Sequence, residues 1–511
     1  MAKESTKARV ARQGIIYVAG QMIGSIAVFL TLIILARQLQ PEQLGLYAIA
    51  IAFYTILGIF ATFSLGTSLR KKLAEDRGKE GRMKLISSAF SITLTFSLFI
   101  AFIGILVSGY VATNIYHQPQ IANALMLAAL LAVFWALFNI TISILVGIGR
   151  VKESAIVDVV YSVAQLIAAP VLVAMGYGLI GAVAGLGIGL VVGVICGVLY
   201  IIRDLRIERA SVNSESMKEM VAFSIPVFIS ALALQGAYNL GILLLGIFAS
   251  APVVANYYNA YKLGSLFLII INSMNFVLLP AFSSVATRTK KAKNIGPIFN
   301  RTLYFSVLIL APIVAFVAAL ARPIIFLFFS RAYTLAPPYL AIMSFGIVLG
   351  VIWNYANVIF LGMGDTKSVV KYQISAAAIQ VALLAILTPL FGVAGMLAAL
   401  FVISPIVINL IYTTVLRKKL AIKIDLSRSY RIAIAAFVLF IVLYAIASLM
   451  SFRYLSIIAD LVVALVLYPP LVSVIGGIGV KDLKSIREIC GSRRVFAPIA
   501  RLLDYAAIFV R

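Results

Sequence analysis

The chain has 511 residues, of which 63% are hydrophobic and 12% are charged, and it carries a net charge of +25 with a mean hydropathy of +1.10. Apolar runs of about 20 residues recur along the chain, and each can cross the roughly 30 Å of bilayer hydrocarbon. This composition excludes a soluble protein and predicts an all-α polytopic membrane protein. Two cysteines, Cys196 and Cys490, supply neither a disulfide framework nor a metal site, and no cofactor is expected.

Hydropathy predicts about fourteen transmembrane helices. The predicted spans lie near residues 13–36, 44–68, 86–112, 121–149, 154–175, 178–202, 219–249, 255–286, 298–321, 338–363, 367–388, 391–416, 431–452 and 455–476. The basic N-terminal segment leads into the first span without a small-residue cleavage site, so we expect this helix to remain in the mature protein.

Lysine and arginine are distributed unevenly between the two sides of these spans. Of the 42 basic residues, 37 fall on the side of both termini and the even-numbered loops, four fall on the other side, and Lys262 lies within a span. The excess places both termini in the cytoplasm, and topology thus explains the positive charge without a nucleic-acid partner. The short loops leave no room for a catalytic domain, and no Gly-x-x-x-x-Gly-Lys-Ser/Thr loop occurs, so an enzyme is not expected.

An internal repeat divides the chain. Four pairs of segments match in the same order at offsets of 210 to 218 residues: 45–47 with 255–257, 70–72 with 288–291, 147–152 with 362–367, and 177–181 with 391–395. We infer duplication of a six-helix unit, with lobes at 1–210 and 211–425 facing each other across a cleft. The region 426–511 adds two helices and a basic, amphipathic cytoplasmic tail.

The predicted span at 255–286 carries a polar stripe. Its members recur at helical spacing and are Tyr258, Tyr261, Lys262, Ser265 and Asn272. A charged group inside a bilayer costs at least about 2.5–3.5 kcal/mol on insertion scales, so such a lysine usually faces protein or a wet cavity. Alternatively, Lys262 snorkels to the headgroups. The duplicated position is Ala52, so the positive charge belongs to the second lobe alone.

Other embedded polar residues are candidates for the cleft. Asn139 and Asn354 occupy equivalent positions of the repeat and either lock the helix bundle by hydrogen bonds or line the cavity. Asn239, on the seventh predicted helix, is a further candidate for substrate binding. Asp158 either binds a coupling ion or is a structural acid near the inner interface. A glycine at every fourth position from Gly181 to Gly197 predicts close helix packing.

Four short segments carry a resemblance to a known family. They are LARQLQPEQLGLY at 35–47, LPAFS at 279–283, GMGDTK at 362–367 and FGVAG at 391–395. They look like the first extracellular turn, the end of the eighth helix, the helix 10–11 turn and the start of helix 12 of the polysaccharide-biosynthesis flippases. Those flippases belong to the multidrug/oligosaccharidyl-lipid/polysaccharide exporter superfamily. The likeness covers roughly residues 10–420.

The resemblance implies two six-helix lobes around a central cavity in the plasma membrane. It also implies translocation of a polyprenyl-(pyro)phosphate-linked oligosaccharide from the inner to the outer leaflet. In that family, basic cavity residues are thought to attract the phosphate of the lipid carrier, a role that Lys262 and also Arg37 fit. The implied partners are the lipid-linked oligosaccharide and the bilayer, with a glycan polymerase or glycosyltransferases as further candidates and a monomer as the expected state.

Three other functions remain open at this point. A multidrug or cation antiporter of the same superfamily would share the architecture, but it would favour embedded carboxylates over a lone lysine. A membrane-embedded glycosyltransferase or polymerase lacks the loops and a convergent acid/base constellation. A membrane scaffold that transports nothing is the third alternative.

The predicted topology is testable by chemical labelling. Cysteines introduced at Lys79, Arg206 or Lys291 should react with an impermeant reagent only from the cytoplasm, and cysteines at Gln118 or Ala332 only from outside. Labelling of position 79 from outside in intact cells would contradict the fourteen-helix arrangement.

Overall fold

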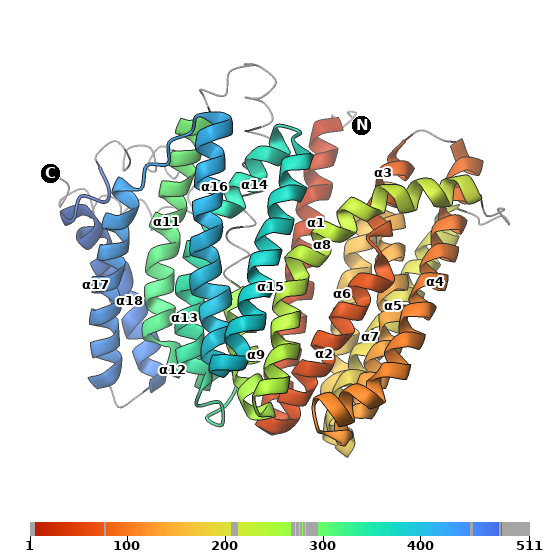
Figure 1. Ribbon diagram of the computed structural model, residues 1–511, viewed down its shortest axis with the longest axis horizontal. Helices are drawn as coiled ribbons and strands as arrows, with labels where there is room; N and C mark the ends of the chain where they lie inside the picture. The colour runs from red at the N-terminus through yellow and green to blue at the C-terminus, as the bar shows by residue number, and fades with distance from the viewer. Residues whose placement is uncertain are drawn as a thin grey trace, which may run out of the picture. The chain divides into compact units, whose positions relative to one another are not determined.

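The computed structural model describes residues 6–75, 78–205, 213–266, 295–449 and 453–479, together with Ile271, Asn275, Leu278, Phe282 and Asp482. These residues are almost all helical, and no strand occurs among them. The chain forms two compact units (Figure 1). Unit 1 comprises Met1–Tyr258 and Gln373–Gly392, and unit 2 comprises Asn259–Tyr372 and Val393–Arg511.

Unit 1 is a helix bundle in which α5 packs against α2, α3, α4 and α7, while α6 packs between α1 and α7. Its helices are α1 (Thr6–Gln38), α2 (Pro41–Thr62), α3 (Leu65–Ala74), α4 (Gly78–Tyr110), η1 (Val111–Ile115), η2 (Pro119–Ile121), α5 (Ala122–Gly147), α6 (Val151–Leu172), η3 (Val173–Tyr177), α7 (Gly178–Leu205) and α8 (Ser214–Phe248). Helix α9 (Ala251–Ser265) continues from unit 1 into unit 2.

Unit 2 is organised around α11, which packs against α13 and α17. Its helices are α11 (Ile295–Ala319), α12 (Ala321–Phe328), α13 (Ala336–Leu349), α14 (Val351–Gly362), η5 (Ala398–Ile403), α16 (Ser404–Leu420), α17 (Ser427–Leu449) and α18 (Arg453–Val474). Helix α15 (Thr366–Leu397) belongs to both units. Helices α17 and α18 lie side by side (Figure 1).

Eleven helical stretches within the described ranges are long and apolar enough to cross a membrane. Two of them, Val151–Arg203 and Thr366–Leu420, have 53 and 55 residues and can each cross twice. The eighth predicted span, 255–286, falls partly on α9 and partly outside the described residues. The all-α multi-pass class is confirmed, whereas the count of fourteen is not fully confirmed.

The two double-length stretches reverse at glycines that the repeat predicts to be equivalent. Gly178 has φ 49° and ψ −129°, and Gly392 has φ 57° and ψ −133°. Gly149 and Gly364 form a second such pair, with φ values of 82° and 76°. These backbone regions strongly favour glycine, because a Cβ clashes there. The two glycines of each matched pair thus have similar, rare backbone angles.

The glycine series on α7 packs against α6, as its spacing predicts. A Cβ on Gly185 would lie 2.2 Å from the Cα of Ala169, and one on Gly193 would lie 3.0 Å from the Cβ of Tyr161. The contacting positions on α6 fall as those on α7 rise, so the two helices run antiparallel. Small residues permit this close backbone approach, which is how helices associate in a bilayer.

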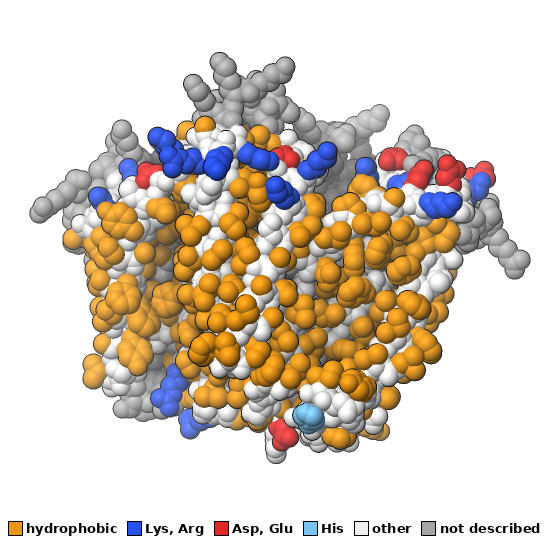
Figure 2. Space-filling model, viewed as in Figure 1, with side chains coloured by type: hydrophobic (Ala, Val, Ile, Leu, Met, Phe, Trp, Pro, Cys, Tyr) orange, Lys and Arg blue, Asp and Glu red, His pale blue; other side chains and the backbone are white. Residues whose placement is uncertain are grey.

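Ion pairs and charged hydrogen bonds within each unit link neighbouring helices near their ends. In unit 1, Lys72 of α3 forms an ion pair with Glu219 of α8. In unit 2, the Lys419 ammonium donates a hydrogen bond of 2.6 Å to the Ser368 hydroxyl, and the Ser368 hydroxyl bond holds the pKa of Asp365 below its ordinary value. Figure 2 shows hydrophobic side chains covering the helix flanks, with lysine and arginine gathered near helix ends.

Alanine substitution of the two reversal glycines should destabilise the protein. Gly178→Ala and Gly392→Ala each force a Cβ into a strained backbone region, which costs about 1–3 kcal/mol. The measurement is the thermal unfolding midpoint in detergent. Gly109→Ala is the matched control, because Gly109 lies inside α4 and a Cβ there would meet nothing within 4 Å. Equal midpoints for all three variants would contradict the strain argument.

Candidate functional site

Helix α9 positions the lysine of the predicted polar stripe. Lys262 lies in the last turn of α9, and its carbonyl accepts a 2.7 Å hydrogen bond from the Ser265 hydroxyl. It follows Ala251 by 11 residues, which is about 16 Å along the helix at 1.5 Å per residue. That distance is about half of the roughly 30 Å hydrocarbon thickness and exceeds the reach of a lysine stem. Lys262 therefore lies farther from the start of α9 than a lysine stem can reach.

Burial changes along the same helix. Tyr257 and Asn259 are fully buried, and Tyr258 is 5% exposed. Tyr261 and Lys262 are partly exposed. The polar stripe is therefore packed in its first part, where it has a structural role, and becomes accessible at the lysine.

Within unit 1, the first part of α9 packs closely on α2. A Cβ on Gly45 would lie 1.8 Å from the carbonyl oxygen of Ala251, so the backbones approach each other at this point only because position 45 is glycine. Two residues after Gly45 and seven after Ala251, the rings of Tyr47 and Tyr258 meet edge to face with centroids 6.4 Å apart. Tyr258 is thus held by an aromatic contact.

The two repeat-related asparagines form different hydrogen bonds. Asn139 donates to the Trp135 carbonyl of its own helix at 2.9 Å. The Asn354 side chain accepts a 2.6 Å hydrogen bond from the amide of Asn275, which lies on a different segment of unit 2. Asn354 therefore connects two segments of the bundle, and Asn139 bonds along its helix.

The remaining candidate residues take no part in the hydrogen bond between Asn275 and Asn354. Asn239 of α8 donates to the Gln235 carbonyl at 2.8 Å. Arg37 is exposed in the last turn of α1, where a positive charge is also favoured by the helix dipole. Asn272 lies outside the described residues.

Asp158 of α6 faces the glycine-containing surface of α1. A Cβ on Gly24 would lie 2.9 Å from an Asp158 carboxylate oxygen and 3.1 Å from the Ser162 hydroxyl. Ser162 in turn donates to the Asp158 backbone carbonyl at 2.8 Å. No group of three or more His, Cys, Asp or Glu residues that could hold a metal occurs in the described segments. Asp158 therefore lies at a helix–helix contact and belongs to no such group in the described segments.

Further polar pairs in unit 2 were not predicted from the sequence. The Tyr412 hydroxyl donates to the Asn357 side chain at 2.8 Å, and the hydroxyls of Ser306 and Tyr355 lie 2.6 Å apart. Asn357 follows Asn354 by one helical turn, a spacing that could have revealed it. The partners Ser306 and Tyr412 lie on other helices, so no spacing in the sequence links them to Asn354.

The fold is shared with flippases and multidrug transporters. A lipid II flippase MurJ in an inward closed conformation superposes with a TM-score of 0.75 at 16% identity, covering 90% of this chain and 98% of that one. An inward-facing multidrug resistance MATE transporter gives 0.65 at 17% identity, covering 79% and 98%. A transporter of the same superfamily from Pyrococcus furiosus gives 0.55 at 18%, covering 81% and 95%. At such identities the likeness establishes the fold.

The sequence model described as "Polysaccharide biosynthesis protein" matches residues 34–338. The chain belongs to this family, and it is a multi-pass membrane protein with the fold of that transporter superfamily. A sequence comparison with curated proteins finds no significant match.

Replacing the two asparagines should separate their roles. Asn354→Leu removes a side-chain hydrogen bond between two segments, and such bonds in membrane bundles average about 0.6 kcal/mol with a maximum near 1.7. Asn139→Leu removes only a bond within one helix and should have the smaller effect. The measurement is the unfolding midpoint in detergent, with Asn275→Leu and the Asn275→Leu/Asn354→Leu pair completing a double-mutant cycle. A coupling energy of zero for that cycle would contradict the assignment.

Proposed function

We propose that this protein is a flippase that moves a polyprenyl-(pyro)phosphate-linked oligosaccharide from the inner to the outer leaflet for cell-surface glycan synthesis. The observation that carries the proposal is the position of Lys262, which is partly exposed and lies about 16 Å along α9 from its start. A cation at this depth supplies a point charge for a phosphate that must leave the headgroup region.

The chemistry of the residues proposed to contact the substrate suits a glycan. A polar head cannot cross hydrocarbon unaided, so a flippase must offer it polar groups while the polyprenyl tail stays in lipid. Tyr261 and the asparagines can stack on and hydrogen-bond a hydroxyl-rich surface. Tyr258 acts indirectly in this proposal, because it is buried against Tyr47 and positions α9.

The transport cycle follows from the predicted duplication. Two lobes, at 1–210 and 211–425, rock about the substrate to expose it to one side at a time, with both termini in the cytoplasm. The protein acts as a monomer, and glycan polymerases or glycosyltransferases supply or consume its substrate. Membership of a polysaccharide biosynthesis family supports this assignment.

An antiporter is the second candidate, and Asp158 is the residue on which it depends. Antiporters hold their coupling ions with embedded carboxylates. Asp158 lies at the contact of α6 with Gly24 of α1, with no acidic or histidine cluster around it in the described ranges. We therefore propose Asp158 at most as a coupling-ion site of the flippase.

The test is transport of a fluorescent lipid-linked oligosaccharide in proteoliposomes. Lys262→Ala should abolish flipping at normal expression, because the charge is lost, whereas Lys262→Arg should keep part of it, because charge survives while shape changes. Lys371→Ala, which removes an exposed lysine of α15, is the matched control and should transport normally.

Several outcomes distinguish the alternatives. Unchanged flipping by Lys262→Ala would contradict the proposed role of the lysine. Movement of a drug in exchange for a cation would identify an antiporter, a change in substrate mass would identify an enzyme, and no movement at all would leave a scaffold. A double variant that moves the lysine to the duplicated position, Ala52→Lys with Lys262→Ala, is a weaker test than the single variants. Ala52 is 1% exposed, and its site leaves little room for a lysine.

A further inference from the structure

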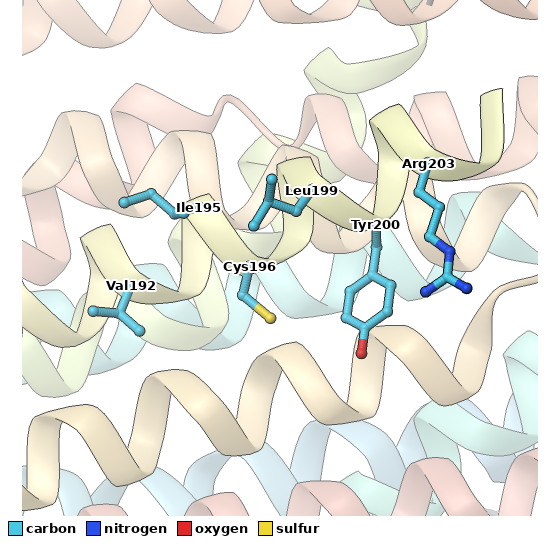
Figure 3. A pocket seen from close by; sticks show the side chains of 6 residues that line it. All are labelled: Val192, Ile195, Cys196, Leu199, Tyr200 and Arg203. Carbon is cyan, nitrogen blue, oxygen red and sulfur yellow. The ribbon is translucent and has the colours of Figure 1, made fainter. Parts of the chain in front are cut away.

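An open groove runs along α7 in unit 1 (Figure 3). It has a volume of about 430 Å³. The lining residues that the structure describes belong to α7 and are Val192, Ile195, Cys196, Leu199, Tyr200 and Arg203. They recur at i, i+3, i+4, i+7, i+8 and i+11, so they occupy one face of the helix. The groove is apolar over most of its length and basic at one end.

This face of α7 is available to lipid. Val192, Ile195 and Leu199 are 36%, 55% and 61% exposed. The adjacent face, which carries the glycine series, packs against α5 and α6: a Cβ on Gly197 would lie 2.3 Å from a Thr141 side-chain carbon. Packing thus holds α7 in place and leaves the groove face outward, where hydrocarbon chains must fill it.

The length of the groove matches one leaflet. Arg203 follows Val192 by 11 positions along α7, which correspond to about 16 Å of helix. One leaflet supplies half of the roughly 30 Å hydrocarbon thickness. An acyl chain placed along Leu199 and Val192 therefore ends near the bilayer centre when its headgroup lies at Arg203.

The basic end has the chemistry to bind a phosphate. Figure 3 shows the Tyr200 ring and the Arg203 guanidinium extending to the same side of α7. Arg203 is exposed and forms no hydrogen bond or ion pair with the side chains that the structure describes. A guanidinium pairs with phosphate oxygens through two parallel hydrogen bonds, and the tyrosine hydroxyl can add a third.

We propose that the α7 groove binds one anionic phospholipid of the leaflet on the basic side of the protein, with an acyl chain along Leu199 and the phosphate on Arg203. Charge complementarity selects an anionic headgroup over a zwitterionic one. Because the groove spans a single leaflet, it suits a lipid that stays in that leaflet and is not moved across the membrane. It is independent of the translocation function proposed above, because none of its residues lies on α9.

The experiment is native mass spectrometry of the purified full-length protein titrated with phosphatidylglycerol or with phosphatidylcholine of the same acyl chains. Phosphatidylglycerol should bind more tightly and raise the unfolding midpoint. Arg203→Gln should weaken its binding about tenfold, the effect of losing one charged hydrogen-bonding group. Leu199→Trp should also weaken binding, because the indole fills the groove.

Matched variants control for general effects of charge and bulk. Lys152→Gln removes an exposed basic residue at the start of α6, and Ile188→Trp adds bulk to an exposed position of α7 outside the groove. Both should bind phosphatidylglycerol as the wild type does. Equal affinity for the two lipids, or an unchanged affinity in both groove variants, would overturn the proposal. Displacement of phosphatidylglycerol by polyprenyl phosphate would instead assign the groove to the carrier lipid.

Discussion

The rest of this structure depends on the absence of water as a hydrogen-bond partner within the hydrocarbon. Every backbone amide and carbonyl at that depth must be satisfied internally, and a helix does this within one segment. Chain reversals are then confined to short segments, where glycines such as Gly178 and Gly392 adopt backbone angles that other residues avoid.

Close backbone contact takes over the role that the hydrophobic effect has in soluble proteins. Lipid tails are as apolar as leucine, so helices associate through van der Waals packing and a few hydrogen bonds. The contact of Gly45 with Ala251 and that of Gly185 with Ala169 show such packing within unit 1. The core of this unit likewise contains Ala61, Ala132 and Ala136.

Placing a charged side chain in the hydrocarbon costs free energy, so the position of such a charge is a guide to function. The described ion pairs, such as Lys419 with Asp365 and Arg428 with Asp482, lie near helix ends. Lys262 differs from them because it lies far along α9, where a charge persists only beside protein, water or an anionic substrate. The second anion site that we propose is at Arg203, at the end of an apolar groove. In these proposals, Lys262 binds the phosphate of the transported lipid, whereas Arg203 binds the phosphate of a lipid that stays in place.

The sequence by itself determined the all-α membrane class and the family resemblance, because the bilayer imposes helix length and charge asymmetry directly on residue order. The internal repeat stays a prediction. The sequence also identified the packing role of the α7 glycines. Only the tertiary structure distinguished Asn354, bonded to Asn275, from its counterpart Asn139. It alone placed Asp158 against Gly24 and left the α7 groove open. The physical reason is that helical spacing fixes which residues share a face, whereas the neighbouring helix decides what that face meets.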